Sequence, residues 1–219
     1  AGNTLGPVVG GVGGYSGYMS SGGTGGTASG VYFSGSTGLS LYSNSMAQLT
    51  GGDGSDGWSN DHSNAFDQVS FGLFLEEDSQ DNQVALNNYY LDEPIVYLAG
   101  QNDIVVEGLH LTSDGNPTNW GKVVAIDCRN VTLRNLEIAE FTGYTGSSVD
   151  HAPGEKGGPG VGVRMLRCES CALVDSTISG ITGGVGGVGG YFSSGGYGGD
   201  AFGLFLDHCP GTTITGNLF

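Results

Sequence analysis

Apolar residues recur along the chain in a fixed frame. The frame starts at six positions: Ser36, Asp81, Gln101, Cys128, Cys168 and Cys209. Most inward positions lie three, five, eight and ten residues after each start, and from Cys128 they are Val131, Leu133, Leu136 and Ile138. Because alternate residues of a strand point to opposite faces, this spacing predicts short β-strands with one buried face.

A short apolar stretch precedes every frame. These stretches are residues 31–33, 71–75, 95–98, 123–126, 161–166 and 202–206. Such short strands cannot bury their apolar face alone, but stacked repeats bury it continuously, so the pattern predicts a solenoid. The shortest spacing, from Asp81 to Gln101, predicts about one full turn, and longer spacings predict a turn plus an insertion.

The frames 128–138, 168–178 and 209–219 resemble the rungs of right-handed parallel β-helices of the pectate-lyase-like superfamily. The resemblance implies an all-β solenoid of about six coils. It implies little about function, because that superfamily contains polysaccharide lyases and hydrolases, phage tailspikes, adhesins and structural coats. A β-sandwich is the alternative fold, and it predicts hairpin turns in place of a recurring frame. We expect an N-terminal glycine-rich segment over 1–30 and a β-helix over 31–219, with insertions at 51–70, 143–160 and 183–201.

Glycine makes up 44 of the 219 residues and is concentrated in the insertions. Residues 183–190 read Gly-Gly-Val-Gly-Gly-Val-Gly-Gly, and residues 10–33 are related to this insertion. An extended left-handed helix with three residues per turn would use such glycines for close backbone packing, as in polyglycine II. A flexible loop has the same composition, so the sequence leaves both interpretations open.

The chain is strongly acidic, with 22 Asp and Glu, 6 Lys and Arg, and a formal net charge of -16. This charge argues against nucleic acid or an anionic lipid surface as a partner. No apolar run reaches the length of a membrane span, so we expect no membrane insertion. The abundance of Gly, Ser, Thr and Asn and the scarcity of Lys favour a secreted, extracellular or cell-surface protein.

Two glycine-rich stretches, 51–58 and 195–202, resemble the calcium-binding nonapeptide of RTX repeats. In RTX proteins the sites form between tandem copies, whereas these two stretches are far apart in the chain. Asp53, Asp56 and Asp61 are the candidate ligands, because carboxylates and turned backbone carbonyls suit Ca²⁺. No cofactor is required, and Ca²⁺ is the candidate ion; an acidic glycine loop without an ion is the alternative.

Cys128, Cys168 and Cys209 share one position of the frame. Neighbouring rungs place them about 4.8 Å apart, within the Cα range of a disulfide. We expect stacked cysteines, either free or with one disulfide such as Cys128 to Cys168, and Cys171 facing inward. Zinc is disfavoured because a C-x-x-C within a strand points its sulfurs to different faces.

The position just before this column carries Asp127, Arg167 and His208. A carboxylate, a guanidinium and an imidazole together could abstract a proton from an acidic sugar. The same column could also be a surface ladder of ion pairs, which a solenoid face produces automatically. The chain lacks the polygalacturonase motifs Asn-Thr-Asp, Asp-Asp, His-Gly and Arg-Ile-Lys, so enzymatic activity is the less favoured hypothesis.

Aromatic residues interrupt the glycine stretches. They are Tyr15, Tyr18, Tyr191, Phe192 and Tyr197. Exposed together they would contact sugar rings or another subunit, and otherwise they anchor the insertions on the coil.

The first and last predicted rungs look open. Phe219 occupies the last inward position of its frame, and Val8 and Val9 lie where a preceding rung would end. Because uncovered edge strands favour association, we expect a piece of a longer chain, end-to-end stacking of copies, or a cap formed by the N-terminal segment. The expected subunit interface comprises Val8, Val9, Leu218 and Phe219.

The function hypothesis that follows is an extracellular structural or adhesive β-helix. Its partner is a further copy, in a head-to-tail filament, or the rest of a longer fibrous surface chain; glycans are a further candidate partner. The alternatives are a polysaccharide-active lyase or hydrolase and a glycan-binding, tailspike-like adhesin.

Overall fold

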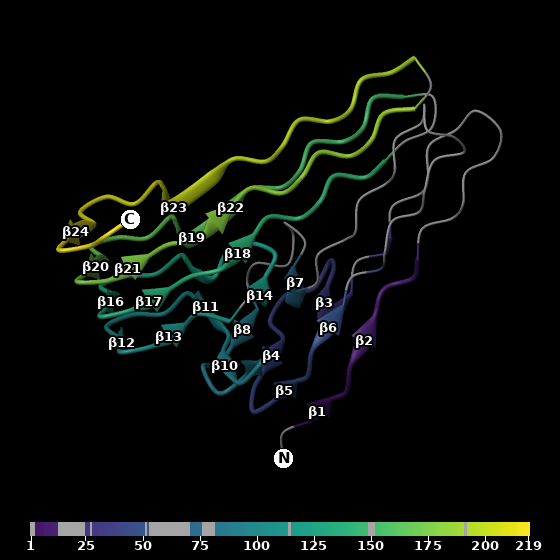
Figure 1. Ribbon diagram of the computed structural model, residues 1–219. Coiled ribbons are helices and arrows are strands. Elements are labelled where there is room, and N and C mark those ends of the chain that lie inside the picture. The colour runs from purple at the N-terminus through teal and green to yellow at the C-terminus, as the bar shows by residue number, and fades with distance from the viewer. Residues whose placement is uncertain are drawn as a thin grey trace.

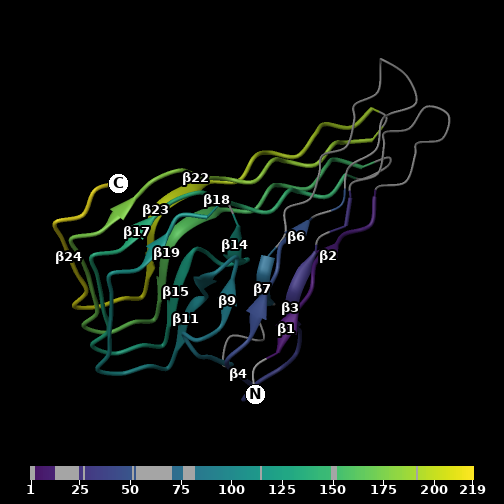
Figure 2. The same cartoon turned by 60° about the horizontal axis from the view of Figure 1, so that its bottom comes forward.

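A computed structural model describes residues 3–12, 25–26, 28–50, 52, 71–75, 82–113, 115–148, 152–190 and 192–219. These residues form an all-β structure of many short strands, drawn in Figures 1 and 2. All strand pairs in this part of the chain are parallel except that of β9 with β10. No helix among these residues has the length and apolar character needed to span a membrane.

Residues from 95 onward form what we call the C-terminal stack. Its first sheet contains β11 (Val96–Ala99), β15 (Val123–Ile126), β19 (Gly160–Leu166) and β23 (Ala201–Asp207). The second contains β12 (Val105–Glu107), β16 (Thr132–Arg134), β20 (Ala172–Val174) and β24 (Thr213–Thr215). The third contains β13 (His110–Leu111), β17 (Glu137–Ile138) and β21 (Thr177–Ile178), and β18 (Phe141–Thr142) pairs with β22 (Ile181–Thr182). Each pass of the chain, here called a rung, adds a strand to successive sheets, which is compatible with a β-solenoid.

Earlier residues form the N-terminal stack. One sheet contains β1 (Thr4–Leu5), β5 (Ser45–Met46), β9 (Tyr89–Tyr90) and β10 (Glu93–Pro94). The pairs are β2 (Val8–Val9) with β6 (Leu49–Thr50), and β4 (Ser40–Leu41) with β8 (Gln83–Val84). A last sheet contains β3 (Ser29–Phe33), β7 (Phe71–Leu75) and β14 (Asn116–Thr118), so β14 joins the two stacks.

The predicted frame from Gln101 onward is confirmed by the strand register. Val106 pairs with Leu133, Leu133 with Leu173, and Leu173 with Ile214. All four occupy the position five residues after their frame start, and the first three are buried. The recurring apolar position therefore marks the inner face of successive rungs.

The frame from Asp81 behaves differently from the prediction. Among the described residues, β8 pairs with β4 and β12 pairs with β16, so the frames from Asp81 and Gln101 are not stacked neighbours. The twenty residues between them are therefore not one turn of a continuous coil. The physical reason is the reversal at β10, which pairs antiparallel with β9 and directs the chain into a second stack.

Two apolar cores follow from this arrangement. Val96 and Leu98 of β11 point into the C-terminal stack, among Val106, Leu133 and Leu173. Their neighbours on the opposite face of β11 belong to a second core, shared with the N-terminal stack, whose members include Met46, Leu73, Tyr97, Ala99, Val124 and Leu166. β11 and β15 are thus buried on both faces, which explains their nearly continuous apolar runs.

The residues before the cysteine column lie at a turn. Gly100, Asp127, Arg167 and His208 have φ of 62°, 53°, 52° and 52°, each at the end of a strand of the first sheet. This left-handed conformation is uncommon outside glycine, asparagine and aspartate. The side chains of Asp127, Arg167 and His208 point outward from this corner, away from the core.

The insertions at 143–160 and 183–201 are hydrogen-bonded to one another. Segments 143–148, 152–160, 183–190 and 193–200, together called the glycine array, run side by side away from β18, β19, β22 and β23 (Figures 1 and 2). Every third residue of 183–190 donates to the same neighbour: Gly184 N to Gly158 O at 2.8 Å, Gly187 N to Glu155 O at 2.8 Å, and Gly190 N to Ala152 O at 3.0 Å. The other sides of this segment bond to 143–148 and 193–200.

The array is packed so closely that most of its glycines have no room for a side chain. A Cβ on Gly143, Gly157, Gly183 or Gly187 would lie closer than 3.0 Å to backbone atoms of a neighbouring segment. Gly10, Gly11, Gly26 and Gly52 are also hydrogen-bonded to one another, with Gly26 N donating to Gly11 O and Gly52 N to Gly26 O. Of these four, Gly10 and Gly52 have no room for a Cβ. The glycine-rich segments that the structure describes are therefore closely packed and hydrogen-bonded to one another.

Candidate functional site

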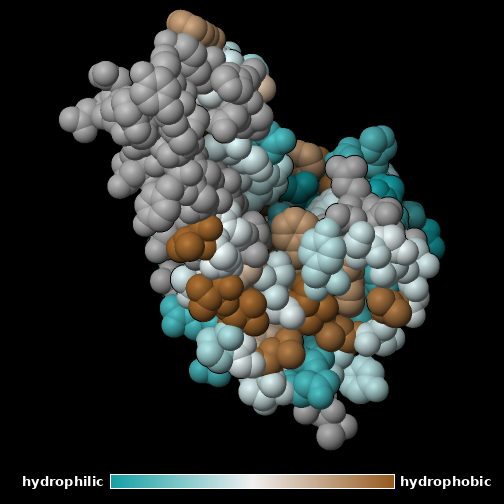
Figure 3. Space-filling model, turned by 90° about the vertical axis from the view of Figure 1, so that its right-hand side faces the viewer, coloured by the Kyte–Doolittle hydropathy of each residue, from teal (hydrophilic) through white to brown (hydrophobic). Residues whose placement is uncertain are grey.

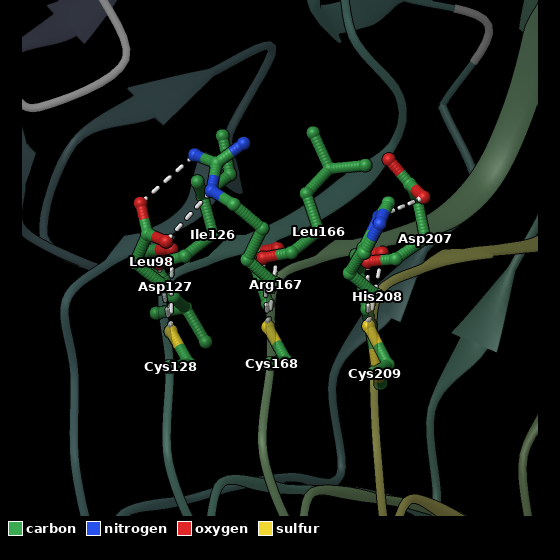
Figure 4. Close-up of polar contacts among 12 residues, drawn as sticks. Leu98, Ile126, Asp127, Cys128, Leu166, Arg167, Cys168, Asp207, His208 and Cys209 are labelled. Carbon is green, nitrogen blue, oxygen red and sulfur yellow. Dashed lines mark hydrogen bonds and ion pairs between the residues drawn. The ribbon is translucent and has the colours of Figure 1, made fainter.

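The structure brings two of the three candidate catalytic residues together. Arg167 Nε lies 2.8 Å from Asp127 Oδ1, and Arg167 Nη2 lies 2.9 Å from Asp127 Oδ2 (Figure 4). His208 is the next residue of the column, but its Nδ1 bonds to Asp207 on its own rung. The Arg167 guanidinium lowers the pKa of Asp127 through its hydrogen bonds, so this carboxylate is a weaker base than a free one.

Similar pairs join other neighbouring rungs. Arg129 pairs with Glu169 at 2.9 Å, and His110 Nδ1 lies 2.8 Å from Glu137 Oε2. Their side chains are about half exposed or more, as are those of Asp127 and Arg167. The column of Asp127 and Arg167 therefore has the character of one step in a surface ladder, in which each pair contributes little to stability.

The cysteine column points into the core. Cys128, Cys168 and Cys209 align on successive rungs, and the thiol of each donates to the carbonyl two residues before it (Figure 4). These distances are 3.3, 3.4 and 3.2 Å, and all four cysteines, including the buried Cys171, are free. Burial raises the pKa of Cys171 and Cys209, and the hydrogen bond to Cys128 together with burial raises that of Cys168. Such thiols are poor nucleophiles.

The candidate calcium ligands Asp53, Asp56 and Asp61 lie outside the described residues. In the second nonapeptide-like stretch, the carboxylate of Asp200 bonds to Lys156 Nζ at 2.9 Å. Among the described residues, no cluster of three or more His, Cys, Asp and Glu side chains is placed to hold a metal ion.

In the part of the chain that the structure describes, the candidate groups form a ladder of ion pairs, a column of thiols and the glycine array. Comparison with protein-family models, with curated proteins and with solved structures found no match. Any functional assignment therefore rests on the residues themselves.

The candidate aromatic contacts are only partly described. Tyr15, Tyr18 and Tyr191 lie outside the described residues. Phe192 and Tyr197 belong to the outer part of the glycine-rich insertion, and they are 93% and 84% exposed. Both rings therefore present most of their surface to solvent.

The predicted interface residues lie at opposite ends of the molecule. Leu218 bonds to β21 through Ile178 N at 2.9 Å, and Phe219 covers Gly203. Val8 and Val9 pair with β6 on one side. Figure 3 looks at the side on which β1 and β2 lie in Figure 1, and it shows several hydrophobic side chains grouped on this face.

The sequence analysis missed a buried cation. Lys122 is fully buried, and its Nζ donates to Ser113 O at 2.7 Å and to Gly115 O at 2.9 Å. Glu93 lies 3.6 Å from this Nζ and accepts hydrogen bonds from the Ser113 backbone and side chain. Lys122 and Glu93 together hold the loop before β14, a structural role that neither residue's spacing in the sequence indicates.

Proposed function

We propose that the chain is an extracellular structural or adhesive protein with a right-handed parallel β-helix, which assembles end to end into a filament or continues in a longer fibrous surface chain. The observation that carries the proposal is the exposure of apolar inner positions at the outermost rungs. Parallel, in-register stacking supports the β-helix, because each rung repeats the one before it. The extracellular setting rests on composition alone.

At the C-terminal stack, the outermost rung is formed by β23 and β24. Ile214 is 38% exposed, whereas Leu173, its partner on the preceding rung, is 0% exposed. Phe219 is 61% exposed, and Ile178 on the preceding rung is 2% exposed. A further rung would bury these side chains as the preceding ones are buried, and would pair the outer backbone edges of β23 and β24.

The other end shows the same contrast. Val8 on β2 is 39% exposed, and its partner Leu49 on β6 is 4% exposed. Among the described residues, β1 pairs with β5 and β2 pairs with β6, which leaves one backbone edge of each open. Two open ends of different shape favour head-to-tail contacts, which generate filaments when the rotation does not close.

The glycine array adds a second argument. We interpret it as polyglycine II-like, because its hydrogen bonds recur at every third residue and join segments on several sides. Gly195 and Gly198 lie on its outermost segment, where a Cβ would meet nothing closer than 3.4 Å, and a Cβ on Gly11 would meet nothing within 4 Å. Their φ values are not positive, so neither conformation nor internal packing requires glycine there. Packing against the array of a neighbouring copy supplies a reason.

Sedimentation velocity over a range of concentrations, with and without Ca²⁺, tests the proposal. We expect assemblies that grow with concentration and are lost on Ile214→Asp with Phe219→Asp. Val105→Asp is the matched control, since Val105 is also an exposed strand residue but lies on β12, at the edge of the second sheet opposite β24. A wild-type protein that stays monomeric at every concentration contradicts end-to-end assembly.

No observation on the described residues favours the alternative of a polysaccharide-active enzyme. Asp127 is held by Arg167, and His208 faces Asp207. We therefore propose no catalytic function for this column.

A further inference from the structure

A groove lies at the junction of the two stacks. It is lined by residues of β4 and β8 from the N-terminal stack and by residues from β11 to the start of β12 from the C-terminal stack. Its volume is about 360 Å³, within the range of small-molecule sites. The groove exists because β8 and β12 do not pair, so the chain leaves a space where a continuous coil would have placed adjacent strands.

The lining combines an apolar floor with polar and aromatic side chains. Leu41, Leu98 and Ile104 are buried or half-buried in it, and Gln83 and Gln101 provide amide groups. Tyr42 also lines the groove and is 62% exposed. None of the described residues that line the groove is charged, although the whole chain carries a net charge of -16.

Hydrogen bonds fix these polar groups in place. Gln83 Nε2 donates to Ala99 O at 3.0 Å, and Gln101 Nε2 donates to Gln83 Oε1 at 2.9 Å. Next to Tyr42, Ser43 has φ of 56°, and its N–H donates to Asn87 Oδ1 at 2.8 Å. The two amides and the backbone beside Tyr42 are therefore positioned before any ligand arrives, which reduces the entropic cost of binding.

We propose that this groove binds a neutral oligosaccharide. A sugar ring presents apolar C–H faces, which suit the Tyr42 ring and the aliphatic floor, and hydroxyl groups at its rim, which suit the glutamine amides. An acidic sugar would lack a cationic partner in this lining. A purely apolar ligand would form no hydrogen bonds with the two glutamine amides. A polypeptide strand added at an edge would use backbone groups more than these side chains.

The inference goes beyond the proposed assembly and does not depend on it. The groove is built from residues of one chain and contains none of the end residues Val8, Ile214, Leu218 and Phe219. Binding should therefore persist in the Ile214→Asp, Phe219→Asp variant, and loss of assembly and loss of binding are separate results.

Affinity electrophoresis in gels containing hydroxyethyl cellulose, xylan, galactomannan or polygalacturonate tests the proposal. We expect retardation by at least one neutral polymer and none by polygalacturonate. Tyr42→Ala should weaken binding about tenfold, because the ring contact is lost. Tyr89→Ala is the matched control, since Tyr89 is an exposed tyrosine outside the groove.

Thermal unfolding checks that Tyr42→Ala is folded, and Gln101→Ala provides an independent variant that should weaken the same interaction. Retardation by polygalacturonate alone, or by none of the four polymers, overturns the proposal. So does unchanged binding in both variants. Specific binding of extended peptides, competed by none of the neutral glycans, would assign the groove to strand addition instead.

Discussion

Substitution of glycines in the glycine array tests whether close backbone packing requires glycine at these positions. In Gly187→Ala, the new Cβ would lie closer than 3.0 Å to backbone atoms of Ser147 and Gly146, which no side-chain movement relieves. Overpacking of this kind costs about 1–3 kcal/mol. In Gly198→Ala, the nearest atom is Gly184 O at 3.6 Å, an ordinary contact. That substitution restricts the unfolded chain and stabilises the protein by about 0.4–1 kcal/mol.

Thermal unfolding of the dilute protein measures the contrast. For a chain of this size, Gly187→Ala should lower Tm by about 2–12 °C and Gly198→Ala should raise it by about 1–4 °C. Gly6→Ala is the control, because a Cβ there meets nothing within 4 Å and Gly6 lies outside the array. Equal Tm values for the Gly187 and Gly198 variants would refute the packing argument. At high concentration, Gly198→Ala should reduce self-association despite its higher stability.

The further predictions concern three residues, Arg167, Lys122 and Cys168. Arg167→Ala should leave any glycan depolymerisation unchanged, and a broad glycan panel checks this. In urea unfolding at pH 7, the free energy of unfolding of this variant should be lower than that of the wild type by less than about 1 kcal/mol, because the ion pair is half exposed. Folding lowers the pKa of Asp127, so this difference should vanish as the pH falls through the lowered pKa. Lys122→Met should lower the free energy of unfolding by about 3–5 kcal/mol, because Glu93 and two carbonyls lose a buried partner. Lys122→Arg, which keeps the charge, is the comparison. Cys168 should react with iodoacetamide only after unfolding, and rapid labelling of the native protein would contradict its burial.

The rungs from Gln101 onward were predictable because most inner positions are apolar and the corners before the frame starts are polar or glycine. Leu133 and Leu173 are core residues by pattern alone, and their pairing confirms it. The break before β11 was not predictable, because alternation continues on both sides of it. Only the antiparallel pairing of β10 and the burial of Tyr97 against the other stack reveal the change.

The sequence predicted that Asp127, Arg167 and His208 stack in one column, but it did not predict which groups they bind. Frame position determines which residues stack, but the partner of each charge depends on its nearest neighbours. Asp207 lies beside His208 and binds it, while Arg167 reaches Asp127 across one rung. The groove was missed for a related reason, since its lining joins residues of two stacks that the frame treated as one.

The most direct test of the central claim is negative-stain electron microscopy of the purified chain at high concentration, with calcium present. The account predicts single-file filaments in the wild-type protein and isolated particles in the Ile214→Asp, Phe219→Asp variant. Isolated particles in the wild-type protein, at concentrations where the variant looks the same, would contradict end-to-end assembly.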